Sequence, residues 1–290
     1  MFGTQVTKGP LRYRERVVRL GPQEQLVGIL TLPVDPSKPL AVVALNAGVL
    51  HRVGPHRLHV RLLRQLAGLG FPGLRLDLAG IGDSLAVGGT QSFRESAVGD
   101  ARAFMDDLVA IVGVRRFVLF GLCSGADNAL ATALVDDRVA GIILLDPPSY
   151  PTRWARARGV AQRIAALSAG GALRWVLRMA RRPLASIRQL ASAGHAPRAE
   201  GREPPPLATY RDQLHQLLER GVRILTIYSG GLGERYNHVD QLFEYAPELR
   251  GRVDHLYFPD ANHTFTERAA QATLVETVVA WVGRTFTSAG

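Results

Sequence analysis

Residues 116–135 read RFVLFGLCSGADNALATALV and decide the fold. The first seven residues are mostly apolar, which is typical of a buried β-strand, and the alanine-rich residues 124–135 favour a helix. The junction Gly121-Leu122-Cys123-Ser124-Gly125 fits a pattern in which a nucleophile, flanked by glycines two positions away, lies on a strained turn. The sequence therefore predicts a strand, a sharp turn carrying Cys123, and a helix.

Cys123 fits the centre of this turn better than Ser124 does. The residues two positions away on either side must lack bulk, so that the strand and the helix can approach each other. Around Cys123 these residues are Gly121 and Gly125, whereas the same positions around Ser124 hold leucine and alanine. A lone cysteine at a strand end is otherwise most often a small buried hydrophobe. Backbone N–H groups at a helix N-terminus stabilise a thiolate, so we predict that Cys123 is the nucleophile.

Short apolar runs alternate with longer amphipathic segments over most of the chain, which is typical of an α/β fold with a mostly parallel sheet. The expected strands are 12–20, 25–32, 40–45, 73–78, 116–122, 139–145, 222–228 and 253–258. The first expected helix begins near residue 55. The others span 92–112, 124–135, 238–250 and 267–286. The alternation stops between residues 149 and 221, where we expect helices at 160–167 and 172–182 and a loop at 195–207. We predict a core domain formed by 1–148 and 222–290, with an insertion at 149–221.

The charge of the chain is concentrated in that insertion. Of the net +10, residues 149–221 carry +9, from thirteen arginines and four acidic residues. Two interpretations stay open, a solvated basic face and a surface that attracts an anionic substrate. We expect no nucleic-acid partner, because the charge is confined to one segment. The single cysteine excludes an internal disulfide, and the absence of a membrane-spanning apolar stretch or a secretion signal predicts a soluble, cytoplasmic protein.

A cysteine nucleophile needs a base and a group that orients the base. His263 follows the last expected strand and precedes the last expected helix, so it lies on the same sheet edge as Cys123 and is the best base. Glu234, in the loop after the strand 222–228, is the preferred acid because it lies on that edge too. The alternatives for the acid are Asp146, Asp240 and Asp260.

Acyl chemistry also needs N–H donors for the negative charge that develops on a carbonyl oxygen. We expect these donors to be the backbone N–H groups of Ser124 and of Val49, in the loop after the strand 40–45. In that loop Gly48 permits close approach of a substrate, and Asn46 either contacts the substrate or braces the loop.

The basic residues that follow this loop are candidates for the border of a substrate pocket. His51 and Arg52 are the nearest of them. A metal site formed by His51, His56 and His59 is disfavoured, because their spacing is irregular and no carboxylate accompanies them. We therefore expect no metal and no cofactor.

The chain resembles the α/β-hydrolase superfamily from about residue 25 to the end, apart from the insertion. The motifs that carry the resemblance are 46–49, Asp77–Ser84, the turn around Cys123, 231–234 and 262–263. The Cys-Ser-Gly-Ala turn is similar to that of hydrolases associated with exosortase or polysaccharide gene clusters. The resemblance implies an eight-stranded, mostly parallel sheet with helices on both faces and a helical cap at 149–221. Two departures are the cysteine in place of the usual serine and Glu234 in place of the usual aspartate.

The function expected from these residues is hydrolysis of an ester or thioester through an acyl-Cys123 intermediate. Two alternatives stay open, namely acyl transfer through the same intermediate and non-catalytic binding of an acyl ligand. The basic cap suggests an anionic substrate, such as a thioester of coenzyme A or of a carrier protein. The basic amphipathic segment 172–182 adds a weaker alternative, which is contact with an anionic membrane surface.

Overall fold

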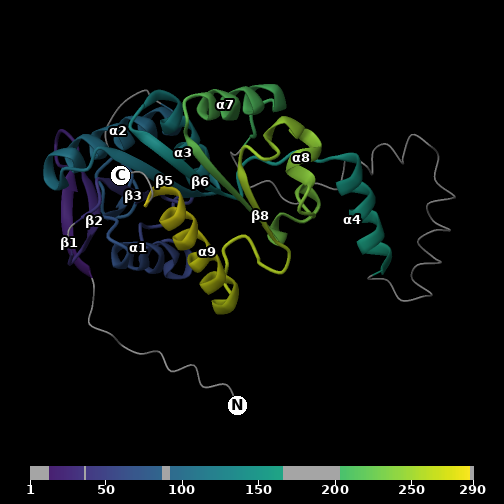
Figure 1. Ribbon diagram of the computed structural model, residues 1–290, viewed down its shortest axis with the longest axis horizontal. Coiled ribbons are helices and arrows are strands. Elements are labelled where there is room, and N and C mark those ends of the chain that lie inside the picture. Colours follow the sequence, from purple (N-terminus) through teal and green to yellow (C-terminus); the bar gives the residue numbers. More distant parts are fainter. Residues whose placement is uncertain (1–12, 36, 87–91, 166–202, 288–290) are drawn as a thin grey trace, which may run out of the picture.

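The structure is a computed structural model that describes residues 13–35, 37–86, 92–165 and 203–287. An eight-stranded sheet runs through its centre, with the strand order β1-β2-β4-β3-β5-β6-β7-β8 (Figure 1). β2 pairs antiparallel with β1 and β4, and every other neighbouring pair is parallel, which confirms the predicted fold class. The strands are β1 (Tyr13–Leu20), β2 (Leu26–Pro33), β3 (Leu40–Ala44), β4 (Gly73–Asp77), β5 (Arg116–Leu122), β6 (Val139–Leu145), β7 (Arg223–Ser229) and β8 (Asp254–Phe258).

Helices cover both faces of the sheet, so the central strands are buried on both sides and are nearly all apolar. One face is covered by α1 (Leu58–Gly68) and α9 (Arg268–Phe286), which lie side by side and share a core cluster with β3. The other face is covered by α2 (Phe93–Val112), α3 (Ser124–Val135) and α7 (Leu207–Glu219).

The parallel strands end at a common edge of the sheet, and this edge positions the candidate site. In the sheet register Leu122 pairs with Leu145, Leu145 pairs with Ile227, and Ser229 pairs with Phe258. The loops that follow β5, β6, β7 and β8 therefore start next to one another. Residues far apart in the sequence meet at this edge.

One expected helix is wrong in part, and the cause is a proline. The segment 238–250 forms the short helix α8 (Gln241–Tyr245) and a separate 3-10 turn, Pro247–Leu249. Proline disfavours the helical conformation in the residue before it, and Ala246 accordingly has φ −142° and ψ 67°. The helix therefore ends after one turn.

The predicted insertion is described at its two ends. Its first helix, α4 (Arg153–Ala165), begins earlier than expected, and its last helix, α7, was not expected from the sequence. Buried residues of α7, including Tyr210 and Leu214, join the core cluster beneath α3, so this end packs on the sheet domain. The helix expected at 172–182 lies outside the described residues. Within the described ranges, the helices are too short or too polar to cross a membrane.

Candidate active site

Cys123 lies on the predicted sharp turn between β5 and α3. Its backbone has φ 57° and ψ −118°, a conformation that few residues with a side chain adopt. A Cβ atom on Gly121 would lie 2.0 Å from the carbonyl oxygen of Gly125, and one on Gly125 would lie 2.6 Å from that of Asn46. The two glycines thus allow the strand, the helix and the loop after β3 to meet. Cys123 itself is half-buried.

Ser124 does not compete for the centre of the turn, because its side chain contacts the loop after β3. The backbone N–H of Gly48 donates to the Ser124 hydroxyl at 2.7 Å. Ser124 is also the first residue of α3, so its own N–H has no partner within the helix. This arrangement agrees with the choice of Cys123 over Ser124 on the turn.

His263 follows β8 and connects a carboxylate with the thiol. Its Nδ1 atom lies 2.6 Å from Oδ2 of Asp146, and the ring is also hydrogen-bonded to Cys123. The hydrogen bond to Asp146 and that to Cys123 raise the pKa of His263 to about 9, although burial of the ring acts in the opposite direction. Both contacts therefore favour the protonated form of the ring.

The carboxylate that contacts His263 belongs to Asp146, so the expected contact with Glu234 is wrong. Asp146 directly follows β6 and has φ 48°, which turns its side chain back toward the end of β7. Glu234 lies in the 3-10 turn η2 (Gly230–Arg235), where Gly233 adopts φ 55°. That turn brings the Glu234 side chain next to Gly159 of α4: a Cβ atom on that glycine would lie 3.5 Å from Glu234 Cγ.

The two remaining acid candidates lie elsewhere. Asp240 is paired with Arg250 at 3.0 Å, and Asp260 is exposed in the loop after β8. The carboxylate that contacts His263 was therefore among the alternatives from the sequence, ranked below Glu234. The signal that could have raised Asp146 was its position, directly at the end of a buried central strand.

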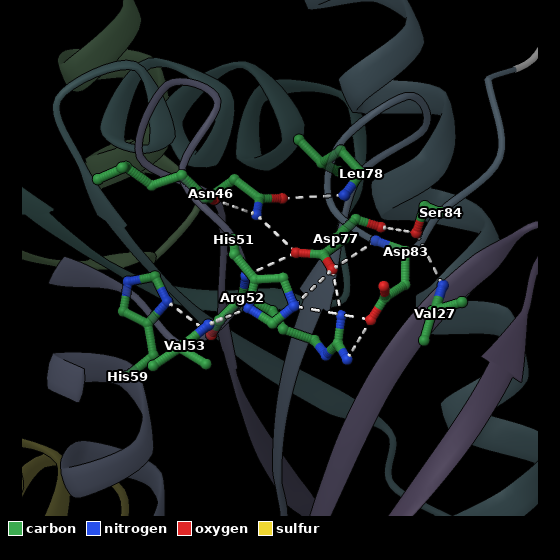
Figure 2. Close-up of polar contacts among 11 residues, drawn as sticks. Val27, Asn46, His51, Arg52, Val53, His59, Asp77, Leu78, Asp83 and Ser84 are labelled. Atoms are coloured by element: carbon green, nitrogen blue, oxygen red, sulfur yellow. Dashed lines mark hydrogen bonds and ion pairs between the residues drawn. The ribbon is translucent and has the colours of Figure 1, made fainter. Parts of the chain in front are cut away.

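The loop after β3 also departs from expectation at Asn46. Its side chain is 1% exposed, and its amide donates to the carbonyl oxygen of Leu50 at 2.8 Å and to Asp77 at 3.2 Å. Its Oδ1 atom accepts from the N–H of Leu78 at 2.9 Å (Figure 2). Both ends of the amide are used internally, so Asn46 braces the loop and its expected substrate contact is wrong. Val49, by contrast, is 85% exposed on the same loop.

A family model described as "Alpha/beta hydrolase family" matches residues 46–276. This chain belongs to the alpha/beta hydrolase family. A comparison with curated protein sequences gives no match.

Solved structures similar to this chain share its fold at low sequence identity. An esterase of Pyrococcus furiosus is 17% identical with a TM-score of 0.58, covering 94% of this chain and 92% of its own. An α/β serine hydrolase without a lid from Xanthomonas campestris is 16% identical with a TM-score of 0.55, covering 95% and 96%. A dienelactone hydrolase of Anabaena variabilis is 13% identical with a TM-score of 0.56, covering 94% and 98%.

The guanidinium of Arg52 is paired with two carboxylates. It binds Asp77 and also Asp83, the latter at 2.7 Å, and the Arg52 side chain is 12% exposed. Its backbone N–H donates to Asp77 Oδ1 at 2.6 Å, so both parts of the residue contact one buried carboxylate (Figure 2). That Arg52 borders a substrate pocket stays a prediction. Arg52 and Asp77 extend the bracing around Asn46.

The histidines of this region have different surroundings. His51 is exposed, and its Nε2 atom lies 3.6 Å from Asp77 and 3.7 Å from Asp83. These three side chains are spaced closely enough for a metal ion, yet the guanidinium of Arg52 already binds both carboxylates. His59 is fully buried away from them, and desolvation lowers its pKa to about 4. Among the described residues, the histidine that lies close to acidic side chains is His51, and the cluster contains neither His56 nor His59.

Proposed function

We propose that this alpha/beta hydrolase cleaves an ester or thioester through an acyl-Cys123 intermediate. The observation that carries the proposal is the chain of contacts from Asp146 through His263 to Cys123, on a turn whose backbone fits a nucleophile. An imidazolium beside a thiol favours the thiolate, which is the reactive form. The esterase and hydrolases that share the fold support hydrolysis as the reaction class.

Acylation begins with attack of the Cys123 sulfur on the acyl carbonyl carbon. The N–H groups of Ser124 and Val49 are the proposed donors to the oxyanion. As the tetrahedral intermediate collapses, the bond to the leaving oxygen or sulfur breaks, and His263 gives its proton to that atom. The products of this step are the free alcohol or thiol and acyl-Cys123.

Deacylation uses the same residues with water as the nucleophile. His263, now neutral, takes a proton from water, and the resulting hydroxide attacks the acyl carbon. The carbon–sulfur bond breaks, which releases a carboxylic acid and restores the Cys123 thiolate beside the protonated His263. Asp146 accepts from Nδ1 throughout, which keeps Nε2 directed at the reacting atoms.

An anionic substrate, such as a coenzyme A or carrier-protein thioester, is favoured by the basic insertion. On α4, the exposed side chains include Arg153, Arg156 and Arg158, whereas Ala155 and Gly159 face η2 and its surroundings. The described part of the insertion therefore directs positive charge to solvent at the side of the molecule where the site lies. Steering by such charges raises association rates and weakens with salt.

The proposal is tested by intact-mass spectrometry with a panel of acyl thioesters and p-nitrophenyl esters. Hydrolysis predicts a transient acyl adduct that decays to the free enzyme in water. An adduct that persists until an alcohol or amine is added means acyl transfer instead. No adduct, together with no reaction of the thiol with iodoacetamide, means a binding protein. Cys123→Ala is the control, because the chain has no other cysteine to label.

A further inference from the structure

We propose that Ser229 is a positioning residue that holds the Asp146 carboxylate in the orientation that binds His263. This inference rests on the proposed function, because it assigns a role within the same site. The motifs recognised in the sequence do not include Ser229, which is the last residue of β7 and is fully buried.

Ser229 binds both oxygen atoms of the carboxylate. Its backbone N–H donates to Asp146 Oδ1 at 2.7 Å, and its hydroxyl donates to Oδ2 at 2.6 Å. Oδ2 is also the atom that contacts Nδ1 of His263 at 2.6 Å. One residue therefore contacts both ends of the carboxylate, and its hydroxyl shares an oxygen with the imidazole.

The backbone around Ser229 is held against the loop that carries His263. A Cβ atom on Gly230 would lie 1.8 Å from the carbonyl oxygen of Pro259, and one on Gly231 would lie 2.3 Å from the backbone nitrogen of His263. The N–H of Gly231 also donates to the carbonyl oxygen of Ala261 at 3.0 Å. The end of β7 and the histidine loop are thus in direct backbone contact.

These backbone contacts do not depend on the Ser229 side chain, so a change of that side chain removes only the contact made by the hydroxyl. Without it, the backbone N–H still binds Oδ1, and the carboxylate can turn about its Cβ–Cγ bond. This rotation of the carboxylate moves Oδ2 away from His263. It also leaves a buried carboxylate oxygen with one hydrogen-bond donor fewer, which costs free energy. The hydroxyl therefore fixes the angle of the carboxylate, and through it the direction of the imidazole.

The test compares Ser229→Ala with Thr226→Val in the complete chain. Thr226 is a buried residue of the same strand, and its hydroxyl contacts Asp254 and His255 of β8. Thr226→Val therefore controls for the general effect of removing a buried hydroxyl from β7. Two quantities are measured, kcat and KM with the ester that the wild type turns over, and the pKa of His263 by histidine ¹⁵N NMR.

Ser229→Ala is expected to lower kcat about 10- to 100-fold with KM nearly unchanged, and to move the pKa of His263 from about 9 toward its ordinary value. Thr226→Val should change neither. Wild-type values of kcat and of this pKa in Ser229→Ala would overturn the role of Ser229. If that variant fails to fold, Ser229→Cys keeps the shape with a weaker donor and is judged in the same way. Absence of turnover in the wild type would contradict the proposed function, whereas the NMR titration would still test Ser229.

Discussion

The Nδ1 atom of His263 lies 2.6 Å from Oδ2 of Asp146, although 117 positions separate the two residues in the chain. The contact joins the loop after β8 to the end of β6, across β7. It gives His263 a carboxylate from the end of β6, whereas the sequence favoured one from the loop after β7.

Asp146→Asn is expected to lower kcat about 10⁴-fold, because the amide favours the wrong imidazole tautomer and loses the charge that stabilises the imidazolium. Glu234→Gln is the matched comparison, because its side chain lies beside Gly159 of α4. It should leave kcat within a few-fold of wild type. Steady-state kinetics with one ester measure both, and the reverse ranking of the two variants would restore Glu234 as the acid.

The activity should depend on pH through His263, whose pKa is raised to about 9. Below that value the ring is protonated and can give its proton to the leaving group. We expect kcat/KM to fall as the pH rises through about 9, and iodoacetamide to alkylate Cys123 readily at pH 7. His263→Gln should slow this alkylation strongly. A rate of alkylation that is unaffected by His263→Gln would mean that the two side chains do not form an ion pair.

Acid should destabilise the fold through His59. Burial lowers the pKa of His59 to about 4, below the ordinary value near 6.5, so the folded state holds the ring neutral. As the pH falls from about 6.5 to 4, the unfolded state takes up a proton that the folded state does not, and stability is lost. The loss is on the order of 3 kcal/mol. Urea unfolding from pH 7 to pH 4 should therefore show a shallower decline for His59→Leu than for the wild type.

The bracing around Asn46 should depend on the buried carboxylate of Asp77. Asp77→Asn leaves the guanidinium of Arg52 with a poorer partner and should cost about 3 kcal/mol of unfolding free energy, with a lower kcat. Asp83→Asn is the control, because Asp83 is 61% exposed and binds the same guanidinium; it should lower the unfolding free energy much less than Asp77→Asn does. Equal effects of the two variants would contradict a bracing role for Asp77.

The turn around Cys123 should tolerate no side chain at Gly121. Gly121→Ala brings a methyl group within 2.0 Å of the carbonyl oxygen of Gly125, so we expect loss of activity and of stability. Gly99→Ala is the control: Gly99 is exposed within α2 and a Cβ atom there meets nothing within 4 Å. The unfolding free energy of the Gly99→Ala variant should rise by about 0.5 to 1 kcal/mol. Thermal unfolding and the rate of ester cleavage measure both effects.

Much of the fold and part of the site could be predicted because they depend on local patterns. The apolar run of β5 and the alanine-rich α3 determine a strand and a helix over residues 116–135, and the two glycines mark the turn between them. The order of strands and helices likewise placed Cys123 and His263 on one sheet edge. Hydrophobic periodicity and glycine position are properties of neighbouring residues, so the sequence by itself determined them.

The partners of these residues were decided by the tertiary structure. Asp146 rather than Glu234 meets His263, because a φ of 48° turns Asp146 toward β7 while the turn at Gly233 carries Glu234 to α4. Ser229 contacts the same carboxylate because β6 and β7 are neighbours in the sheet. A side chain reaches only a few ångströms, so its partner depends on strand register and on the direction of each turn. Those are relationships between distant segments, which a local pattern does not contain.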